Sequence, residues 1–384
     1  MIEHSKSRRW RIAAVLAVLL SITLGVLKVQ IQRAHPPDWA LDGTHLYEGY
    51  PSIDWFCFRV EWLRGTIEGT MNQAYSEWRP EDRLHAGAWL VPLLVAVTSK
   101  LTGSIPVAFQ VLSALAIALL CLGIHRFVRS ARATEDDEDD DDTVSSLAVI
   151  AFAAHVLVCR TAGHLYFDPF VALWMLASLG ASLRYARTGS HVVRLAAIQT
   201  TGLFLKSSFL PALAIPVLAA WFVDGSRTEQ RRIVARSLWC FVLPPIAIYL
   251  TFMAWSHGSA FQSTADMQHL ATTWRLDSAQ LRAFGIEMLM LFQWLPLGVL
   301  WTRPWKNRRG RIALLSGGIV LVATWSFGLP AIGRLYLPAL MFGIMGVFAC
   351  SEEKLAPRHW NSIVLVFACA NYAVVAFGLW QLTR

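Results

Sequence analysis

Long apolar segments alternate with short polar segments along most of the chain. The first apolar segment covers residues 12–31 and directly follows a group of basic residues. Ten more follow at residues 105–128, 144–160, 170–183, 193–205, 209–223, 238–255, 283–301, 312–327, 335–348 and 363–380. An apolar helix of roughly 20 residues is long enough to cross a bilayer. The pattern predicts an all-α polytopic membrane protein with about 11 transmembrane helices.

The composition agrees with burial in lipid. Hydrophobic residues make up 55% of the chain, charged residues only 16%, and the mean hydropathy is +0.45. Soluble domains carry about 25% charged residues. The formal net charge is +8, but the Lys and Arg residues lie in short stretches between apolar segments. That arrangement is typical of membrane orientation signals and argues against nucleic acid as a partner.

The charges of these connecting stretches orient the predicted helices. If residues 86–101 form a partly inserted helix that does not cross, every basic loop lies on one side, including the loop at 224–237. The positive-inside rule then places these loops and the amino terminus in the cytoplasm. We expect a single transmembrane domain over residues 1–384 in the cytoplasmic membrane of the cell, without a separate soluble domain.

Two polar stretches of this predicted topology lie between the helices. Residues 32–84 are expected to form a long first extracytoplasmic loop. Residues 133–144 are strongly acidic and are expected to form a cytoplasmic loop. That loop should stay solvated, because like charges repel one another and resist ordering.

Several ionisable residues share the outer face in this topology. Asp168 and Lys206 each lie in a tight turn between two apolar segments, near the membrane boundary. An unpaired charge is costly there, so we expect these two residues to form a structural ion pair or to serve a function. The outer loops add further polar and aromatic candidates, which are Asp42, Asp54, Trp55, Arg59, Arg83, His85, Asp266, His269 and Arg334.

Three segments carry a resemblance to a known superfamily. The segment HLYFDPFVALWMLASLG, in which Asp168 precedes Pro169, resembles the second acidic motif of the C-type glycosyltransferases (GT-C). Within that superfamily the chain is most similar to the lipid A aminoarabinose transferases and the protein O-mannosyltransferases. LKSSFL around Lys206 is similar to their Thr-Lys-Gly turn, and GRLYLPAL, which contains Arg334, resembles their Arg-Tyr-Leu-Pro motif.

The first outer loop supplies the other part of this resemblance. The family has a catalytic aspartate in this loop, commonly followed by glutamate, and Asp54 takes that place although Trp55 follows it. Asp42 is the alternative aspartate. In the segment RPEDRLHAGAWLVP, Arg83 or His85 stands for a basic residue that the family places later in the loop.

The resemblance implies transfer of a sugar from a polyprenyl-phosphate donor to an acceptor hydroxyl or amide on the outer face, with inversion. Asp54 would act as the general base, and Asp168 would orient it or share a divalent metal ion with it. The acceptor would be a glycan, a lipid or a protein. Cationic side chains would bind the donor phosphate, and these are Arg59, Arg83, Lys206 and Arg334. Contacts to the acceptor or the sugar would come from Trp55, His85, Asp266 and His269.

Two other functions stay open. One is transport or flipping of a lipid-linked or small polar solute. The sequence shows no internal repeat and no matching pair of interrupted helices in two halves, which transporters often have. The other is a non-catalytic protein with a GT-C-like fold, because a fold alone does not establish an activity.

Overall fold

The computed structural model describes residues 2–34, 60, 63–65, 89–132, 138–162, 167–223, 226–257, 282, 285, 288–289, 291–326, 336–349 and 357–382. Within those ranges the chain is 92% helical and contains no strand. Four helical stretches are long and apolar enough to cross a membrane, namely Ser7–Ile31, Ile105–Arg132, Arg227–Phe252 and Asn361–Leu382. These properties indicate a helical membrane protein with several crossings. The total of about 11 crossings stays a prediction.

The contacts divide the chain into two compact units. Unit 1 comprises Met1–Gly25, Ala116–Ala162 and Trp274–Gln381, and unit 2 comprises Val26–Leu115, Gly163–Thr273 and Leu382–Arg384. The helices α1 (Ile2–Ala34) and α5 (Ile105–Arg132) each pass from one unit into the other. The single transmembrane domain stays a prediction.

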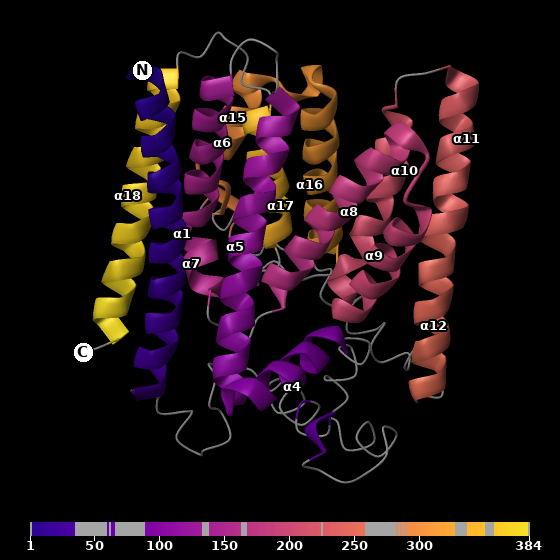
Figure 1. Cartoon of the computed structure of the whole chain (residues 1–384), viewed down its shortest axis with the longest axis horizontal. Coiled ribbons are helices and arrows are strands. Elements are labelled where there is room, and N and C mark those ends of the chain that lie inside the picture. The colour runs from indigo at the N-terminus through magenta and orange to yellow at the C-terminus, as the bar shows by residue number, and fades with distance from the viewer. Residues whose placement is uncertain are drawn as a thin grey trace. The chain divides into compact units, whose positions relative to one another are not determined.

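Unit 1 is built around a helix that is buried on all sides. Its elements besides parts of α1 and α5 are α6 (Glu138–Ala153), α7 (Val156–Thr161), α15 (Leu295–Thr302), η5 (Pro304–Lys306), α16 (Arg308–Ser326), α17 (Leu337–Ala349) and α18 (Pro357–Leu382). All 13 residues of α17 are buried, which fits a helix that is apolar all round. α17 packs against α6, α15 and α16 (Figure 1). α18 runs beside α1, and Tyr372 of α18 forms hydrogen bonds with Ser21 and Ala17 of α1 (Figure 1).

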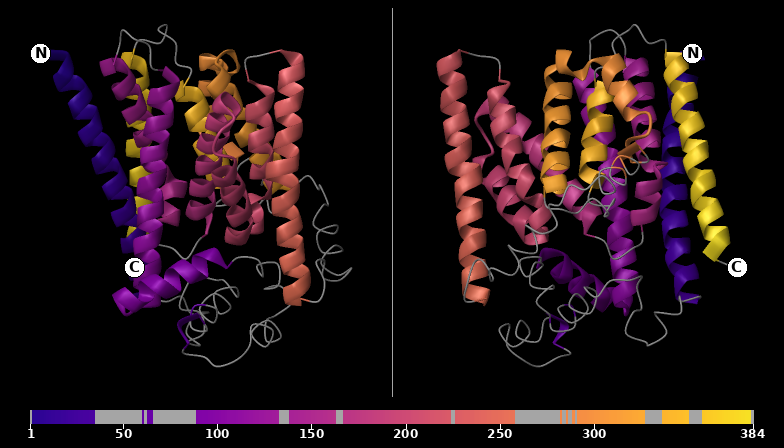
Figure 2. Two further views of the ribbon diagram at one scale, coloured as in Figure 1. Left: turned by 45° about the vertical axis from the view of Figure 1, so that its right-hand side comes forward. Right: turned by 180° about the vertical axis from the view of Figure 1, so that it is seen from behind.

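Unit 2 contains α4 (Leu90–Thr102), α8 (Asp168–Thr188), α9 (Val192–Leu205), η3 (Ser207–Ala214), α10 (Ile215–Trp221), α11 (Arg227–Ser237), η4 (Leu238–Val242) and α12 (Leu243–His257). α8 packs against α9 and α10, and α9 packs against α12. α4 has 13 residues, a length of about 20 Å, and lies across the direction of α12 (Figures 1 and 2). This length fits a helix that does not cross a bilayer core of about 30 Å, and its depth in the membrane stays a prediction.

Several predicted boundaries differ from the structure. The apolar segment 144–160 is not one helix, because α6 ends at Ala153 and α7 begins at Val156. The segment 209–223 is likewise divided, into η3, which contains Pro211, and α10. The stretch expected as a basic loop before residue 238 is the helix α11, which continues through the π-helical turn η4 into α12.

A capping contact explains why α11 is helical. The side-chain hydroxyl of Ser226 accepts a hydrogen bond from the backbone N–H of Glu229 at 3.2 Å. Ser and Glu three residues apart are typical of a capping box at a helix amino terminus. The helix therefore begins in the basic stretch and not at the first apolar residue.

A close approach between α9 and η3 yields a stability prediction. A Cβ atom at Gly202 would clash with the ring of Phe209, whose side chain is fully buried. We expect Gly202→Ala to lower the free energy of unfolding by about 1–3 kcal/mol, because the ring must move within a packed core. Gly180→Ala is the matched control, since Gly180 of α8 faces open space and alanine favours helices. Equal losses of thermal stability in the two variants would contradict this packing.

Candidate functional site

The structure brings Asp168 and Lys206 into direct contact within unit 2. The Nζ atom of Lys206 donates a hydrogen bond to Oδ1 of Asp168 at 3.1 Å. The Asp168 side chain is 3% exposed and the Lys206 side chain 11%. The two residues therefore form a buried ion pair. The sequence predicts either a structural ion pair or a function for these residues, and the contact establishes the pairing.

Local sequence places each partner at a helix end. Asp168 is the first residue of α8, and Pro169, which has no backbone N–H to leave unsatisfied, occupies the first turn. A carboxylate in the first turn also interacts favourably with the helix dipole. Lys206 follows the last residue of α9 in an extended conformation, with φ −172° and ψ 145°. The helix thus ends at Lys206 and the next element, η3, begins at Ser207.

Two buried phenylalanines flank Asp168 in the chain and contact a third. Phe167 and Phe170 flank Asp168 and are buried, and both rings contact Phe109 of α5. The centroid of the Phe109 ring lies 6.4 Å from that of Phe167 and 5.7 Å from that of Phe170. The low polarity of such surroundings strengthens the attraction between the charges and also makes the loss of either charge costly.

Within unit 2, the ion pair and the basic residues lie at opposite ends of α8 and α9. Asp168 begins α8, whereas Arg184 and Arg187 lie near its carboxyl end. Lys206 follows the end of α9, whereas Arg194 lies near its beginning. α8 has 21 residues and is about 30 Å long, comparable with a bilayer core. This separation agrees with a polar site at one membrane boundary and basic residues at the other.

The other residues of the predicted site lie outside the described residues. These are Asp42, Asp54, Trp55, Arg59, Arg83, His85, Asp266, His269 and Arg334. The structure therefore brings together two of the predicted residues, and the assembly of the others around them stays a prediction. The same holds for a metal ion shared by Asp54 and Asp168. Among the described residues, no group of three or more His, Cys, Asp or Glu side chains lies close enough to hold a metal ion.

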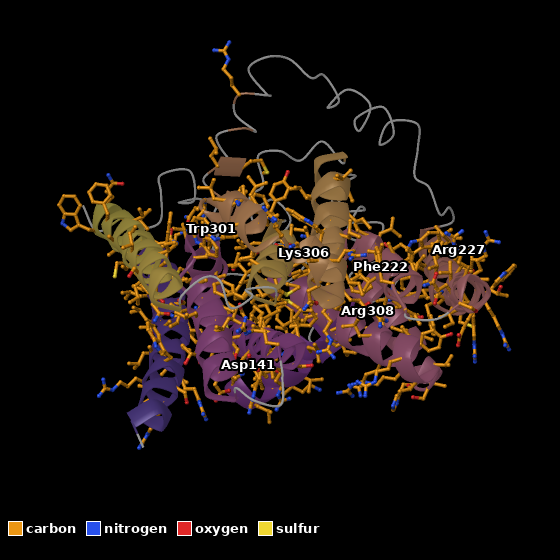
Figure 3. The ribbon with its side chains drawn as sticks, turned by 90° about the horizontal axis from the view of Figure 1, so that it is seen from above. Asp141, Phe222, Arg227, Trp301, Lys306 and Arg308 are labelled. Atoms are coloured by element: carbon orange, nitrogen blue, oxygen red, sulfur yellow. The ribbon has the colours of Figure 1, made fainter. Side chains whose placement is uncertain are left out.

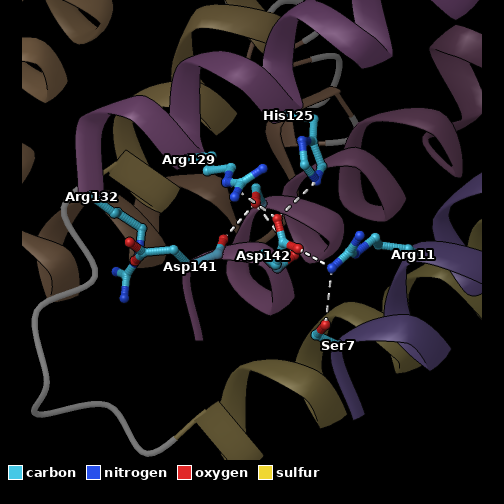
Figure 4. Close-up of polar contacts among 8 residues, drawn as sticks. Ser7, Arg11, His125, Arg129, Arg132, Asp141 and Asp142 are labelled. Atoms are coloured by element: carbon cyan, nitrogen blue, oxygen red, sulfur yellow. Dashed lines mark hydrogen bonds and ion pairs between the residues drawn. The ribbon is translucent and has the colours of Figure 1, made fainter. Parts of the chain in front are cut away.

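The acidic stretch at residues 133–144 corrects one prediction. From Glu138 onward it is the start of α6, and Asp141 and Asp142 are buried, so the expectation of a solvated loop is wrong for this part. Asp142 forms ion pairs with Arg11 of α1 at 2.5 Å and with Arg129 of α5 at 3.4 Å (Figure 4). Asp141 pairs with Arg132 at 3.0 Å.

The physical reason lies in charges that come from elsewhere in the chain. Repulsion among the acidic residues does not decide their structure, because cations from α1 and α5 neutralise two of the carboxylates. His125 adds a further contact, with its Nε2 atom 4.0 Å from Oδ1 of Asp142. Carboxylates in the first turns of α6 are also stabilised by the helix dipole. The signal in the sequence was the group of basic residues at the end of α5, which precedes the acidic stretch directly.

A second polar cluster in unit 1, at the interruption between α6 and α7, was not found from the sequence. His155 lies in this interruption and is buried. Its Nδ1 atom accepts a hydrogen bond from the backbone N–H of Leu157 at 3.1 Å, which caps α7. Its Nε2 atom therefore carries the hydrogen and donates a hydrogen bond to the carbonyl oxygen of Leu291 at 2.7 Å. The only signal was a histidine within an apolar segment.

Residues of α1 and α18 extend this cluster. The Ser21 hydroxyl donates to the carbonyl of Ala153 at 2.6 Å, at the end of α6. The hydroxyl oxygen of Tyr372 lies 3.0 Å from that of Ser21, and the Tyr372 hydroxyl donates a hydrogen bond to the carbonyl oxygen of Ala17 at 2.8 Å. Asn371 and Gln293 exchange two side-chain hydrogen bonds of 2.7 and 3.3 Å. Such contacts satisfy polar groups in an apolar environment where the helices are interrupted.

Comparisons of the chain with models of protein families, with curated proteins and with solved structures find no match. The helices and their apolar lengths define the chain as a helical multi-pass membrane protein. The GT-C resemblance rests on the motifs around Asp54, Asp168, Lys206 and Arg334 and stays a prediction.

Proposed function

We propose that the protein is a membrane glycosyltransferase of the GT-C type, which transfers a sugar from a polyprenyl-phosphate donor to an acceptor. The observation that supports this proposal most is the buried contact between Asp168 and Lys206. Both residues belong to motifs that resemble the family, and they are 38 positions apart in the chain. Each of the two motifs resembles the family separately, and their contact in the structure favours one shared site.

In the proposed reaction the acceptor attacks the anomeric carbon of the sugar directly. Asp54 takes the proton from the acceptor hydroxyl, the new glycosidic bond forms, and the bond from the sugar to the phosphate oxygen breaks. The configuration at the anomeric carbon is inverted. A well-placed general base contributes about 10²–10⁴ in rate. Asp42 is the alternative base.

Lys206 is the described residue that best fits the departing phosphate. An ammonium group binds phosphate as a point charge, and a buried cation stabilises developing negative charge more strongly than an exposed one. Asp168 holds this ammonium in place at 3.1 Å, so that its position is set before the donor binds. We assign Arg59, Arg83 and Arg334 to the same phosphate, and Trp55, His85, Asp266 and His269 to the sugar or the acceptor. A divalent metal ion between Asp54 and Asp168 is the alternative source of positive charge.

The proposal includes an orientation. The amino terminus and the arginines of α11 face the cytoplasm, and Asp168 and Lys206 face the opposite side of the cytoplasmic membrane. Polyprenyl-linked donor lipid reaches the site from the bilayer, and the acceptor glycan, lipid or protein reaches it from outside. Seven arginines at the far end of α8 and α9 support this orientation.

A second candidate is a transporter or flippase, which the polar cluster of unit 1 favours. Interrupted helices with polar contacts inside the membrane are typical of transporters. His155 occupies such an interruption, and Ser21 and Asn371 lie inside two of the candidate spans. Their hydrogen bonds are made to one another and to nearby carbonyls, which also fits a structural role. A non-catalytic membrane protein of the same fold is the third reading.

One assay separates these functions. The purified chain in vesicles is given a panel of polyprenyl-phosphate monosaccharides together with acceptor lipids, and the products are analysed by mass spectrometry. We expect free polyprenyl phosphate and a glycosylated acceptor to form in equal amounts from at least one donor. Movement of an intact donor or solute across the vesicle membrane, without cleavage of the sugar–phosphate bond, would instead establish the transporter.

A further inference from the structure

One end of unit 2 carries a dense group of arginines. Within the described residues 184–194 and 226–239 there are seven arginines and a single carboxylate, Glu229. The arginines are Arg184, Arg187, Arg194, Arg227, Arg231, Arg232 and Arg236, and all of them are exposed. α8 ends, α9 begins and α11 begins at this end, and Figure 3 shows Arg227 there near Phe222. No ion pair joins these arginines to a carboxylate in the part of the chain that the structure describes.

The helix α11 is amphipathic, and its packing determines which side chains point outward. Ile233 packs against two buried clusters, one formed by residues of α8, α9 and η4 and the other by residues of α8 and α10. The adjoining face of the helix is exposed and contains Arg232 and Arg236, one helical turn apart. The Arg236 guanidinium lies 6.0 Å from the centre of the Tyr185 ring, which ties this face to the end of α8.

An exposed tryptophan continues the same face of the helix. Trp239 follows Arg236 by three residues and is 71% exposed. Trp221, at the end of α10, is 61% exposed. Tryptophan prefers the interface between headgroups and acyl chains. Along this helix two guanidinium groups come first and an indole follows. A phospholipid in the membrane has the matching order, with its phosphate above its acyl chains.

We propose that this end of unit 2 binds the headgroup of an anionic phospholipid of the surrounding membrane. The arginine surface, which comprises the seven arginines above, binds the phosphate, because guanidinium groups bind phosphate oxygens in pairs of hydrogen bonds. Trp239 lies beside the acyl chains. The site is independent of the proposed sugar transfer, because Asp168 and Lys206 lie at the opposite end of α8 and α9.

Lipid binding to the full-length chain tests this proposal. The purified protein in detergent is titrated with dioleoyl phosphatidylglycerol or dioleoyl phosphatidylcholine, and bound lipids are counted by native mass spectrometry. We expect wild-type protein to prefer the anionic lipid. The double variant Arg232→Gln/Arg236→Gln should weaken phosphatidylglycerol binding about 25-fold, because each arginine near the surface contributes about fivefold. Its binding of phosphatidylcholine should not change.

Two further double variants test whether the loss of phosphatidylglycerol binding is specific to the arginine surface. Arg8→Gln/Arg9→Gln removes the same charge from exposed positions of α1, outside the arginine surface, and should weaken phosphatidylglycerol binding by less than about fivefold in total. Arg231→Gln/Arg232→Gln leaves the contact between Arg236 and Tyr185 intact and should reproduce the loss. Equal affinity of wild-type protein for both lipids, or an equal loss in the α1 variant, would overturn the proposal. Either result would leave these arginines as orientation signals alone.

Discussion

Replacing Asp54 with asparagine is expected to lower the rate of sugar transfer by about 10²-fold or more while donor binding stays nearly unchanged. Asparagine has the size of aspartate and can make similar hydrogen bonds, but it cannot accept the proton from the acceptor hydroxyl. The effect should therefore fall on kcat and not on the affinity for the donor. Initial rates of polyprenyl phosphate release, together with donor binding at equilibrium, measure the two quantities separately.

The matched control for this prediction is Asp42→Asn. Both aspartates lie in the predicted first outer loop at residues 32–84, so a general effect of removing negative charge there should appear in both variants. We expect Asp42→Asn to keep most of the activity. Full activity in Asp54→Asn, combined with loss of activity in Asp42→Asn, would show that Asp42 is the base.

The second large effect concerns the ion pair of Asp168 and Lys206. Removing either charge leaves the other buried without its partner, so Asp168→Leu and Lys206→Met should each lower the free energy of unfolding by about 3–5 kcal/mol. In the double variant neither charge remains, and apolar side chains of similar volume should restore much of the lost stability. Thermal unfolding of the three variants measures this coupling.

Activity separates a structural ion pair from a donor site. If Lys206 binds the donor phosphate, the double variant folds but transfers no sugar, because the phosphate has lost its cation. If the pair only connects α8 to the end of α9, the double variant regains activity together with stability. The second outcome would remove Asp168 and Lys206 from the proposed site and leave the first outer loop as the candidate for catalysis.

The helical class and the polar ends of the helices could be predicted from the sequence, since they depend on local properties. Apolar length identified the first and last spans, which the structure describes as parts of α1 and α18. Asp168 followed by Pro169 is typical of a helix start, and α8 begins at Asp168. The contact of Asp168 with Lys206 was one of the two outcomes expected, because an isolated charge near the membrane boundary is costly.

The differences arise where contacts distant in sequence decide the local structure. Asp142 pairs with Arg129, which is close in the chain, and also with Arg11, which is 131 positions away and could not be matched to it from the pattern of charges. The interruption at His155 depends on the carbonyl of Leu291, 136 positions away. The start of α11 is a different case, because Ser226 and Glu229 form a local signal that counting apolar residues overlooks.

The most direct test of the proposed donor site is photo-crosslinking with a polyprenyl phosphate that carries a diazirine next to its phosphate. The wild-type chain in vesicles is irradiated, digested and analysed by mass spectrometry. We predict labelled peptides from residues 167–171 and 205–210, with labelling suppressed by excess polyprenyl phosphate and not by polyprenol without the phosphate. Labelling confined to other parts of the chain, or equal suppression by both competitors, would contradict a phosphate site at Asp168 and Lys206.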